Sequence, residues 1–165
     1  MTILVADTSV LIDLERGGLL AHAFSCGLTM VVPDLLYARE LASDNGPLLR
    51  KLGLGMVALE PAEVDFAQQL RRQRPGLSLP DCFALSCARR QDHALVSGDR
   101  HLRTQAHGHQ CTVYGLLWML DEMEGSGRAG TALLHEGLSR IWQHPRQRLP
   151  KSEVLERLQR WSTGW

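Results

Sequence analysis

Short runs of apolar residues alternate along the chain with longer stretches in which apolar residues recur at helical spacing. The first run, Ile3 to Ala6, is rich in strand-forming residues and ends at Asp-Thr-Ser, where a helix can begin. The pattern predicts strands at 3–6, 29–32, 56–59, 94–97 and 111–113, and helices at 8–14, 19–26, 35–42, 61–72, 79–91 and 116–124. This alternation predicts an α/β fold with a mainly parallel sheet.

A Gly/Ser-rich segment, 125–130, is the one plausible boundary in the chain. Two further helices are expected after it, at 131–143 and 151–161, and in the second one Val154, Leu158 and Trp161 share a face. We therefore expect a domain at 1–124 and a helical extension at 125–165. The extension either packs on the same domain or lies at a dimer interface, and the pattern does not choose between these arrangements.

The length of 165 residues suits one domain that folds without disulfide bonds. Lysine plus arginine and aspartate plus glutamate are 18 each, so the net charge is zero. This balance argues against a general polybasic nucleic-acid binder but allows an enzyme with a local basic rim. None of the four cysteines has zinc-site spacing, and Cys82 and Cys87 are expected in the core as reduced thiols.

The start of the chain lacks a basic region followed by a long apolar run, so we expect no signal peptide. No stretch approaches the length of a membrane span. A cytoplasmic location is the expectation from these two observations.

Four acidic residues occupy positions that an α/β fold can bring together. Asp7 ends the first expected strand, and Asp99 follows the fourth by one glycine. Ligands of open parallel sheets bind beyond the carboxyl ends of the strands, so these two acids are candidates for one site. Asp81 lies in the first turn of an expected helix, and Glu40 lies in the helix that follows the second strand.

Carboxylates that lie close together repel one another, so such a cluster needs a cation or raised pKa values. A set of oxygen ligands favours Mg²⁺ or Mn²⁺ over zinc. These metals activate water and neutralise charge on a phosphodiester, which is why a nuclease can work with acids alone.

Each acid also has a structural interpretation. Asp7 can turn the chain or cap a helix, and Gly98-Asp99 is a common turn pair. Asp81 forms a capping-box pattern with Ser78, and Glu40 can be a solvated helix residue. The nearby His101, His107 and His109 lack the spacing of a metal site, which favours surface histidines.

Four segments together resemble the motifs of the PIN-domain family, in particular VapC-like toxins of bacterial toxin–antitoxin systems. They are VADTSVLIDLERG with Asp7, VVPDLLYAREL with Glu40, LSLPDCFALSCARR with Asp81, and ALVSGDRHLR with Asp99. The motifs occur in the family's order and on the expected elements, and the resemblance covers residues 3–124.

The resemblance implies a three-layer α/β/α fold, dependence on Mg²⁺ or Mn²⁺, and endoribonuclease activity on single-stranded RNA. It also implies a homodimer and often a small antitoxin protein as a partner. Asp7, Asp81 and Asp99 would hold the metal, and Glu40 would complete the pocket.

The motifs also contain residues that could support these acids or the substrate. Ser9 and Ser97 would fix the carboxylates by hydrogen bonds, although Ser97 could equally be a turn hydroxyl. Arg100 and Arg103 could meet RNA phosphates, and a solvated helix face is the alternative setting for both.

Two other functions compete with this interpretation. A haloacid-dehalogenase-type phosphatase also begins with an aspartate after its first strand, but it needs a second aspartate where this chain has Ser9. A non-catalytic module could use the same acids to bind metal or a basic partner. The intact set of four acids argues against such a module without excluding it.

Overall fold

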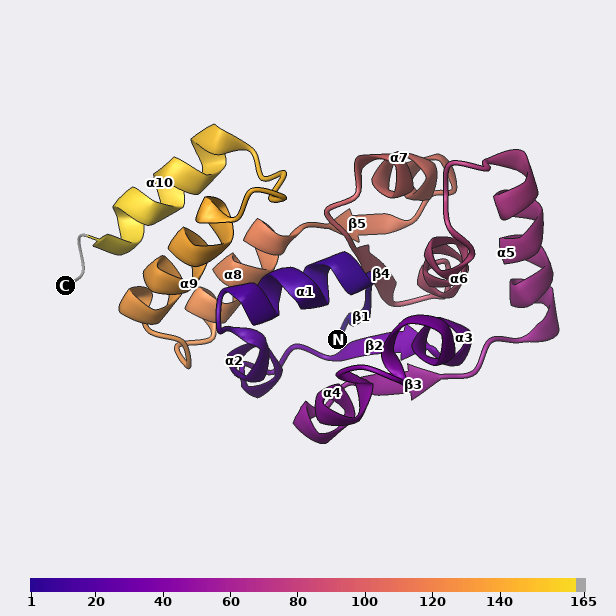
Figure 1. The fold of residues 1–165 in the computed structure, drawn as a ribbon, viewed down its shortest axis with the longest axis horizontal. Helices are drawn as coiled ribbons and strands as arrows, with labels where there is room; N and C mark the ends of the chain where they lie inside the picture. The colour runs from indigo at the N-terminus through magenta and orange to yellow at the C-terminus, as the bar shows by residue number, and fades with distance from the viewer. Residues whose placement is uncertain (163–165) are drawn as a thin grey trace.

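Five short strands form the centre of the protein, and all of them run parallel (Figure 1). The structure is a computed structural model that describes residues 1–162. Its strands are β1 (Ile3–Ala6), β2 (Met30–Pro33), β3 (Gly55–Val57), β4 (His93–Val96) and β5 (Thr112–Tyr114). They lie in the order β3-β2-β1-β4-β5. This confirms the α/β class and makes the sheet parallel throughout.

Helices connect and flank these strands. In chain order they are α1 (Thr8–Arg16), α2 (Leu20–Ser25), α3 (Asp34–Leu36), the π-helix η1 (Tyr37–Leu41), α4 (Gly46–Leu52), α5 (Pro61–Gln73), α6 (Leu79–Ala88), α7 (Arg100–Gly108), α8 (Leu116–Gly125), α9 (Thr131–Gln143) and α10 (Lys151–Ser162). Within residues 1–162, no helix is both long and apolar enough to cross a membrane.

The strand order places a topological switch point between β1 and β4. The chain leaves β1 toward β2 and β3 on one side, and it leaves β4 toward β5 on the other. Crossovers between parallel strands are right-handed, so the helices after these two strands cover opposite faces of the sheet. A crevice opens beyond the carboxyl ends of β1 and β4, which is where α/β proteins bind ligands.

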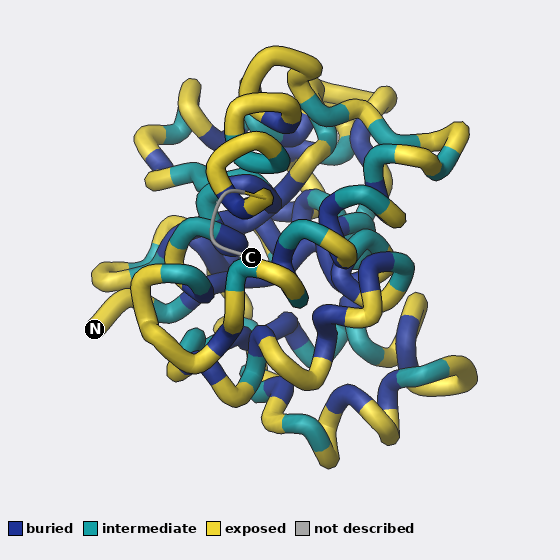
Figure 2. Tube along the Cα trace, turned by 90° about the vertical axis from the view of Figure 1, so that its left-hand side faces the viewer, coloured by how far each residue is buried: buried dark blue, intermediate teal, exposed yellow. Residues whose placement is uncertain are grey.

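Consecutive residues of the central strands are buried, because helices cover both faces of the sheet. Leu4, Val5 and Ala6 alternate in direction along β1, and none is more than 2% exposed. Helix α6 packs on β1, β2 and β4, and α5 packs on α6. Cys82 and Cys87 are buried in α6 as expected. Figure 2 shows the buried segments gathered in the middle of the molecule.

Most expected elements are present, with boundaries that differ by a few residues. The first helix continues to Arg16 rather than ending at Leu14, and α6 ends at Ala88 rather than at Gln91. Helix α4 is not among the elements expected from the sequence; its first residues are Gly46 and Pro47. Helix α7 contains Arg100 and Arg103, for which a solvated helix face was the alternative interpretation of the sequence.

The segment after residue 130 packs on the N-terminal helices. Gly17, which directly follows α1, and Gly137 of α9 allow this close approach, since a Cβ on Gly137 would lie 2.5 Å from Leu19 Cδ1. Helix α10 packs on α9 (Figure 1). Its Trp161 is fully buried, and the indole Nε1 donates a hydrogen bond to Glu124 at 2.7 Å.

Candidate active site

Asp7 lies at the switch point, directly after β1. Its backbone N–H donates to the carbonyl of Val96 at 2.9 Å, which ties the end of β1 to the end of β4. Asp7 occupies the position before the first turn of α1, where a side chain can cap the helix, but it makes no such bond. Asp7 therefore occupies the capping position without forming the side-chain cap bond.

Two serines hold the Asp7 carboxylate. The hydroxyls of Ser9 and Ser97 both donate to its Oδ2, each at 2.8 Å. Asp7 is only 5% exposed, its Oδ1 receives no side-chain hydrogen bond among the described residues, and the Ser9 backbone N–H also lowers the pKa of the carboxyl. Within residues 1–162, no fully buried side-chain oxygen lacks a partner, so Oδ1 is not sealed from solvent. This oxygen can bind a ligand in the crevice.

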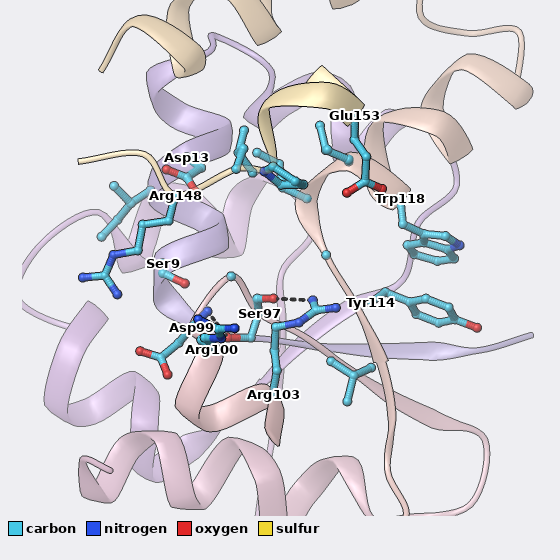
Figure 3. Close-up of a pocket in the computed structure, with 18 of the residues that line it drawn as sticks. Ser9, Asp13, Ser97, Asp99, Arg100, Arg103, Tyr114, Trp118, Arg148 and Glu153 are labelled. Carbon is cyan, nitrogen blue, oxygen red and sulfur yellow. Dashed lines mark hydrogen bonds between the residues drawn. The ribbon is translucent and has the colours of Figure 1, made fainter. Parts of the chain in front are cut away.

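Ser97 connects two of the acids. It is fully buried, and its hydroxyl donates to Asp7 while accepting a hydrogen bond from the Asp99 backbone N–H at 3.0 Å. Arg103 donates from Nη1 to the Ser97 carbonyl at 2.8 Å, as Figure 3 shows. Ser97 is thus more than a turn hydroxyl, and the Arg103 guanidinium is partly occupied in holding the turn after β4.

Asp81 and Asp99 each use one carboxylate oxygen in a hydrogen bond at the start of a helix. Asp99 Oδ1 accepts from the Leu102 N–H at 2.8 Å. Asp81 accepts from the Ser78 N–H through Oδ2 at 3.4 Å, and Ser78 Oγ accepts from the Asp81 N–H at 3.2 Å. The capping-box interpretation of Asp81 is confirmed, whereas Asp99, interpreted from the sequence as part of a turn pair, caps α7. Both arrangements leave the second carboxylate oxygen available.

Glu40 lies in a π-helical turn, a feature that often marks functional sites. The wider turn is closed by the Ala42 N–H, which donates to the Tyr37 carbonyl at 2.8 Å. Thr8 at the start of α1 donates through Oγ1 to Glu40 Oε1 at 3.2 Å. This bond connects Glu40 to the residue next to Asp7, a contact that the sequence did not predict.

The four acids affect one another electrostatically. Desolvation raises the pKa of Asp7, and the charge of Asp99 raises it further, against the hydrogen bonds from Ser97 and Ser9. Desolvation also raises the pKa of Asp81, with Asp7 and Asp99 as additional causes. The pKa of Glu40 is raised by desolvation, opposed by the Thr8 hydrogen bond, and raised again by Asp7 and Asp81. The fold therefore gathers all four acids in one field of negative charge.

The amino-acid sequence matches a family model for the PIN domain over residues 3–163, nearly the whole chain. The chain belongs to the PIN-domain family. PIN domains are generally nucleases, and they typically use divalent metal ions. No curated protein matches the chain.

The match extends past residue 124 and includes the helices that follow the Gly/Ser-rich segment of this PIN domain. The resemblance in the sequence had covered only residues 3–124. The family model thus also covers the part of the chain that packs on α1.

The acids of this PIN domain do not converge into a complete coordination shell. Within residues 1–162, no group of three or more His, Cys, Asp or Glu side chains is close enough to hold a metal ion. His101, His107 and His109 therefore belong to no such group. The His109 ring packs edge-on against Phe66.

A large pocket adjoins the acids. It has a volume of about 1110 Å³, and its lining includes Ser9, Ser97 and Asp99. Asp13 also lines it, and desolvation raises the pKa of Asp13 against the charge of Arg16. The sequence motifs predicted the acidic end of this pocket. They did not predict its other walls, which come from β5, α8 and the segment between α9 and α10.

Proposed function

We propose that this PIN domain is a metal-dependent endoribonuclease that hydrolyses phosphodiester bonds of single-stranded RNA. The observation that supports the proposal best is the Asp7 carboxylate. It is held by two serines at the switch point, within the field of three other acids, and has one oxygen open to a ligand. A buried carboxylate with raised pKa values around it suits a cation site better than a structural turn.

The oxygen donors of these residues suit a hard divalent cation, although within residues 1–162 they do not converge on one point. All candidate ligands are carboxylate oxygens; desolvation by burial raises the pKa values of Asp7, Asp81 and Glu40, and the charges of neighbouring acids raise them further. We propose that Asp7, Asp81 and Asp99 hold Mg²⁺ or Mn²⁺. A bound metal of this kind would stabilise negative charge on the phosphate and lower the pKa of water.

Other side chains of this protein orient the acids and take part in proton transfer. Ser9 and Ser97 orient the Asp7 carboxylate, and Thr8 orients Glu40. Glu40, with a raised pKa, is suited to accept a proton from the water that attacks phosphorus. Hydrolysis forms one phosphorus–oxygen bond and breaks another, and it leaves a phosphate on one RNA fragment and a hydroxyl on the other.

We propose RNA as the substrate and a toxin role because the motifs resemble those of VapC-like toxins. On the same ground we propose a homodimer and a small antitoxin partner. A non-catalytic module that binds metal or a basic partner with the same acids is the alternative function.

The test is cleavage of a fluorescent single-stranded RNA by the wild-type chain with Mn²⁺, with Mg²⁺ or with EDTA. Asp7→Asn removes one charge from the site, and Asp65→Asn removes one from the exposed face of α5 as a matched control. We expect metal-dependent cleavage by the wild type and Asp65→Asn, and a loss of at least about 100-fold in Asp7→Asn. A DNA strand of the same sequence tests the choice of RNA.

Cleavage that persists in EDTA or in Asp7→Asn would contradict the proposal. If the wild type cleaves no RNA but binds Mn²⁺ in an Asp7-dependent manner by calorimetry, the non-catalytic module is the correct function.

A further inference from the structure

The pocket beside the acids has a local excess of positive charge in a chain whose net charge is zero. Six arginines and four acidic residues line it. Asp13 pairs with Arg16 at 3.5 Å, and Asp121 pairs with Arg157 at 2.6 Å. Arg103 is partly occupied by its hydrogen bond to the Ser97 carbonyl, and the three arginines that remain are available to an anionic ligand.

Three of these arginines are exposed, at positions 100, 146 and 148. Among the described residues 1–162, their guanidinium groups form no hydrogen bond or ion pair. Arg100 follows Asp99 at the start of α7, whereas Arg146 and Arg148 belong to the segment between α9 and α10. The C-terminal part of the chain thus brings cations to the rim of the acidic site.

Two aromatic side chains lie in another part of the pocket lining. Tyr114 ends β5, Trp118 lies in the first turn of α8, and their rings stack at 3.8 Å with an angle of 8° between the planes. Both side chains are half-buried. Figure 3 shows Asp99 and Arg148 toward one side of the pocket and the Tyr114–Trp118 pair toward the opposite side.

Unpaired cations near a site of phosphodiester chemistry, together with a flat aromatic surface, suit a single nucleic-acid strand. Its phosphates need positive charge, and its unpaired bases stack on aromatic rings with little regard to sequence. A duplex keeps its bases stacked inside and cannot use such a surface. An acidic peptide would use the arginines but gains less from the stacked ring pair.

We propose that this pocket is the binding groove for the RNA strand: Arg100 and Arg148 contact backbone phosphates, and the Tyr114–Trp118 pair stacks with an unpaired base. The inference rests on the proposed ribonuclease function and adds a subsite to it. It gives the C-terminal part of the chain a direct role in holding the substrate.

The first test is RNA binding measured by fluorescence anisotropy in EDTA, so that no cleavage interferes. The probe is an unstructured RNA of about ten nucleotides, within the usual range of single-strand sites. Arg148→Ala is compared with Arg72→Ala, since Arg72 is an exposed arginine of α5 outside the pocket. We expect Arg148→Ala to raise Kd about 3- to 10-fold and to reduce the salt dependence by about 0.7. Arg72→Ala should change neither quantity.

The second test examines the ring pair by combining a protein change with an RNA change. Single abasic nucleotides are placed in turn along the probe. We expect wild-type binding to weaken about 5- to 100-fold at one position. The same abasic probe should cause little further loss in Trp118→Leu, because the base and the ring interact with each other. A merely structural effect of Trp118→Leu would weaken all probes equally.

Failure of this inference can be separated from failure of the proposed function. If the wild type cleaves RNA with Mn²⁺ while Arg148→Ala and Trp118→Leu bind RNA as Arg72→Ala does, the groove is wrong and the ribonuclease stands. Tighter binding of an acidic peptide than of RNA to the same pocket would also overturn the groove. Absence of any metal-dependent cleavage by the wild type contradicts the proposed function itself.

Discussion

Ser97 offers the sharpest test of how the acids are held. Ser97→Ala removes a fully buried hydroxyl that serves two partners at once, the Asp7 carboxylate and the Asp99 backbone N–H. Alanine fits the space, so the change removes hydrogen bonds without adding atoms. Ser86→Ala is the matched control, because Ser86 is also buried but bonds only a neutral carbonyl, that of Glu63, at 2.8 Å.

The expected magnitude follows from the two bonds. A hydrogen bond to a charged group contributes roughly 1.5–3 kcal/mol, and a buried N–H left without a partner costs about 1–3 kcal/mol. Since solvent and Ser9 can compensate part of both losses, we expect Ser97→Ala to lower the free energy of unfolding by about 2–4 kcal/mol. Ser86→Ala should lower it by about 1 kcal/mol. In a chain of this size, the larger loss corresponds to a decrease in Tm of roughly 5–15 °C.

The pH dependence distinguishes Ser97 from an ordinary buried serine. The Ser97 hydrogen bond lowers the pKa of Asp7, although burial keeps that pKa above the ordinary value of 3.8. Removing the bond raises the pKa further and disfavours the charged form. The stability difference between Ser97→Ala and the wild type should therefore be full at pH values above the raised pKa of Asp7, where this carboxylate is ionised. It should shrink toward pH 3.8 as Asp7 becomes protonated.

Urea denaturation of the metal-free chain at several pH values measures both quantities. In the cleavage assay, the acid limb of the pH profile should move to higher pH in Ser97→Ala and stay in place in Ser86→Ala. The reasoning is refuted if the two variants lose equal stability and their losses do not vary with pH.

Two further predictions concern packing and charge. Gly137→Ala should lower the free energy of unfolding by about 1–3 kcal/mol, because its Cβ would lie 2.5 Å from Leu19 Cδ1, whereas Gly125→Ala should be near neutral in denaturation. Equal effects would contradict the packing of α9 on the N-terminal helices. In EDTA, Tm should fall as pH rises above the ordinary values of 3.8 and 4.5, because acids with raised pKa values stabilise the fold only while protonated. Asp7→Asn should weaken this fall in Tm. Added Mn²⁺ should reverse the fall in Tm in the wild type but not in Asp7→Asn.

Local patterns in the sequence predicted much of the fold. The apolar run at 3–6 forms β1, and the alternation of strands and helices predicted the α/β class. These features depend on short-range spacing, which a single chain displays directly. The pattern did not predict α4, whose first turn contains Gly46 and Pro47, residues that are also common in turns.

The acids themselves could also be found in the sequence, but their state could not. Asp7 and Asp99 both precede a helix, and both could cap it. Only Asp99 does so, because two serines, one of them 90 residues away, hold the Asp7 carboxylate instead. Hydrogen bonds of this kind join elements that are distant in the chain, so no local pattern contains them.

The sequence by itself determined the elements, the family motifs and the four acids, because each follows from nearby residues. The tertiary structure decided which carboxylate oxygens stay free, how strongly the acids raise one another's pKa values, and which side chains form the pocket. Arg148 lies far along the chain from Asp99, and the Tyr114–Trp118 pair follows a different strand, yet all line one cavity. Burial and charge interactions depend on distance in space, so they appear only when the sheet and its helices have packed.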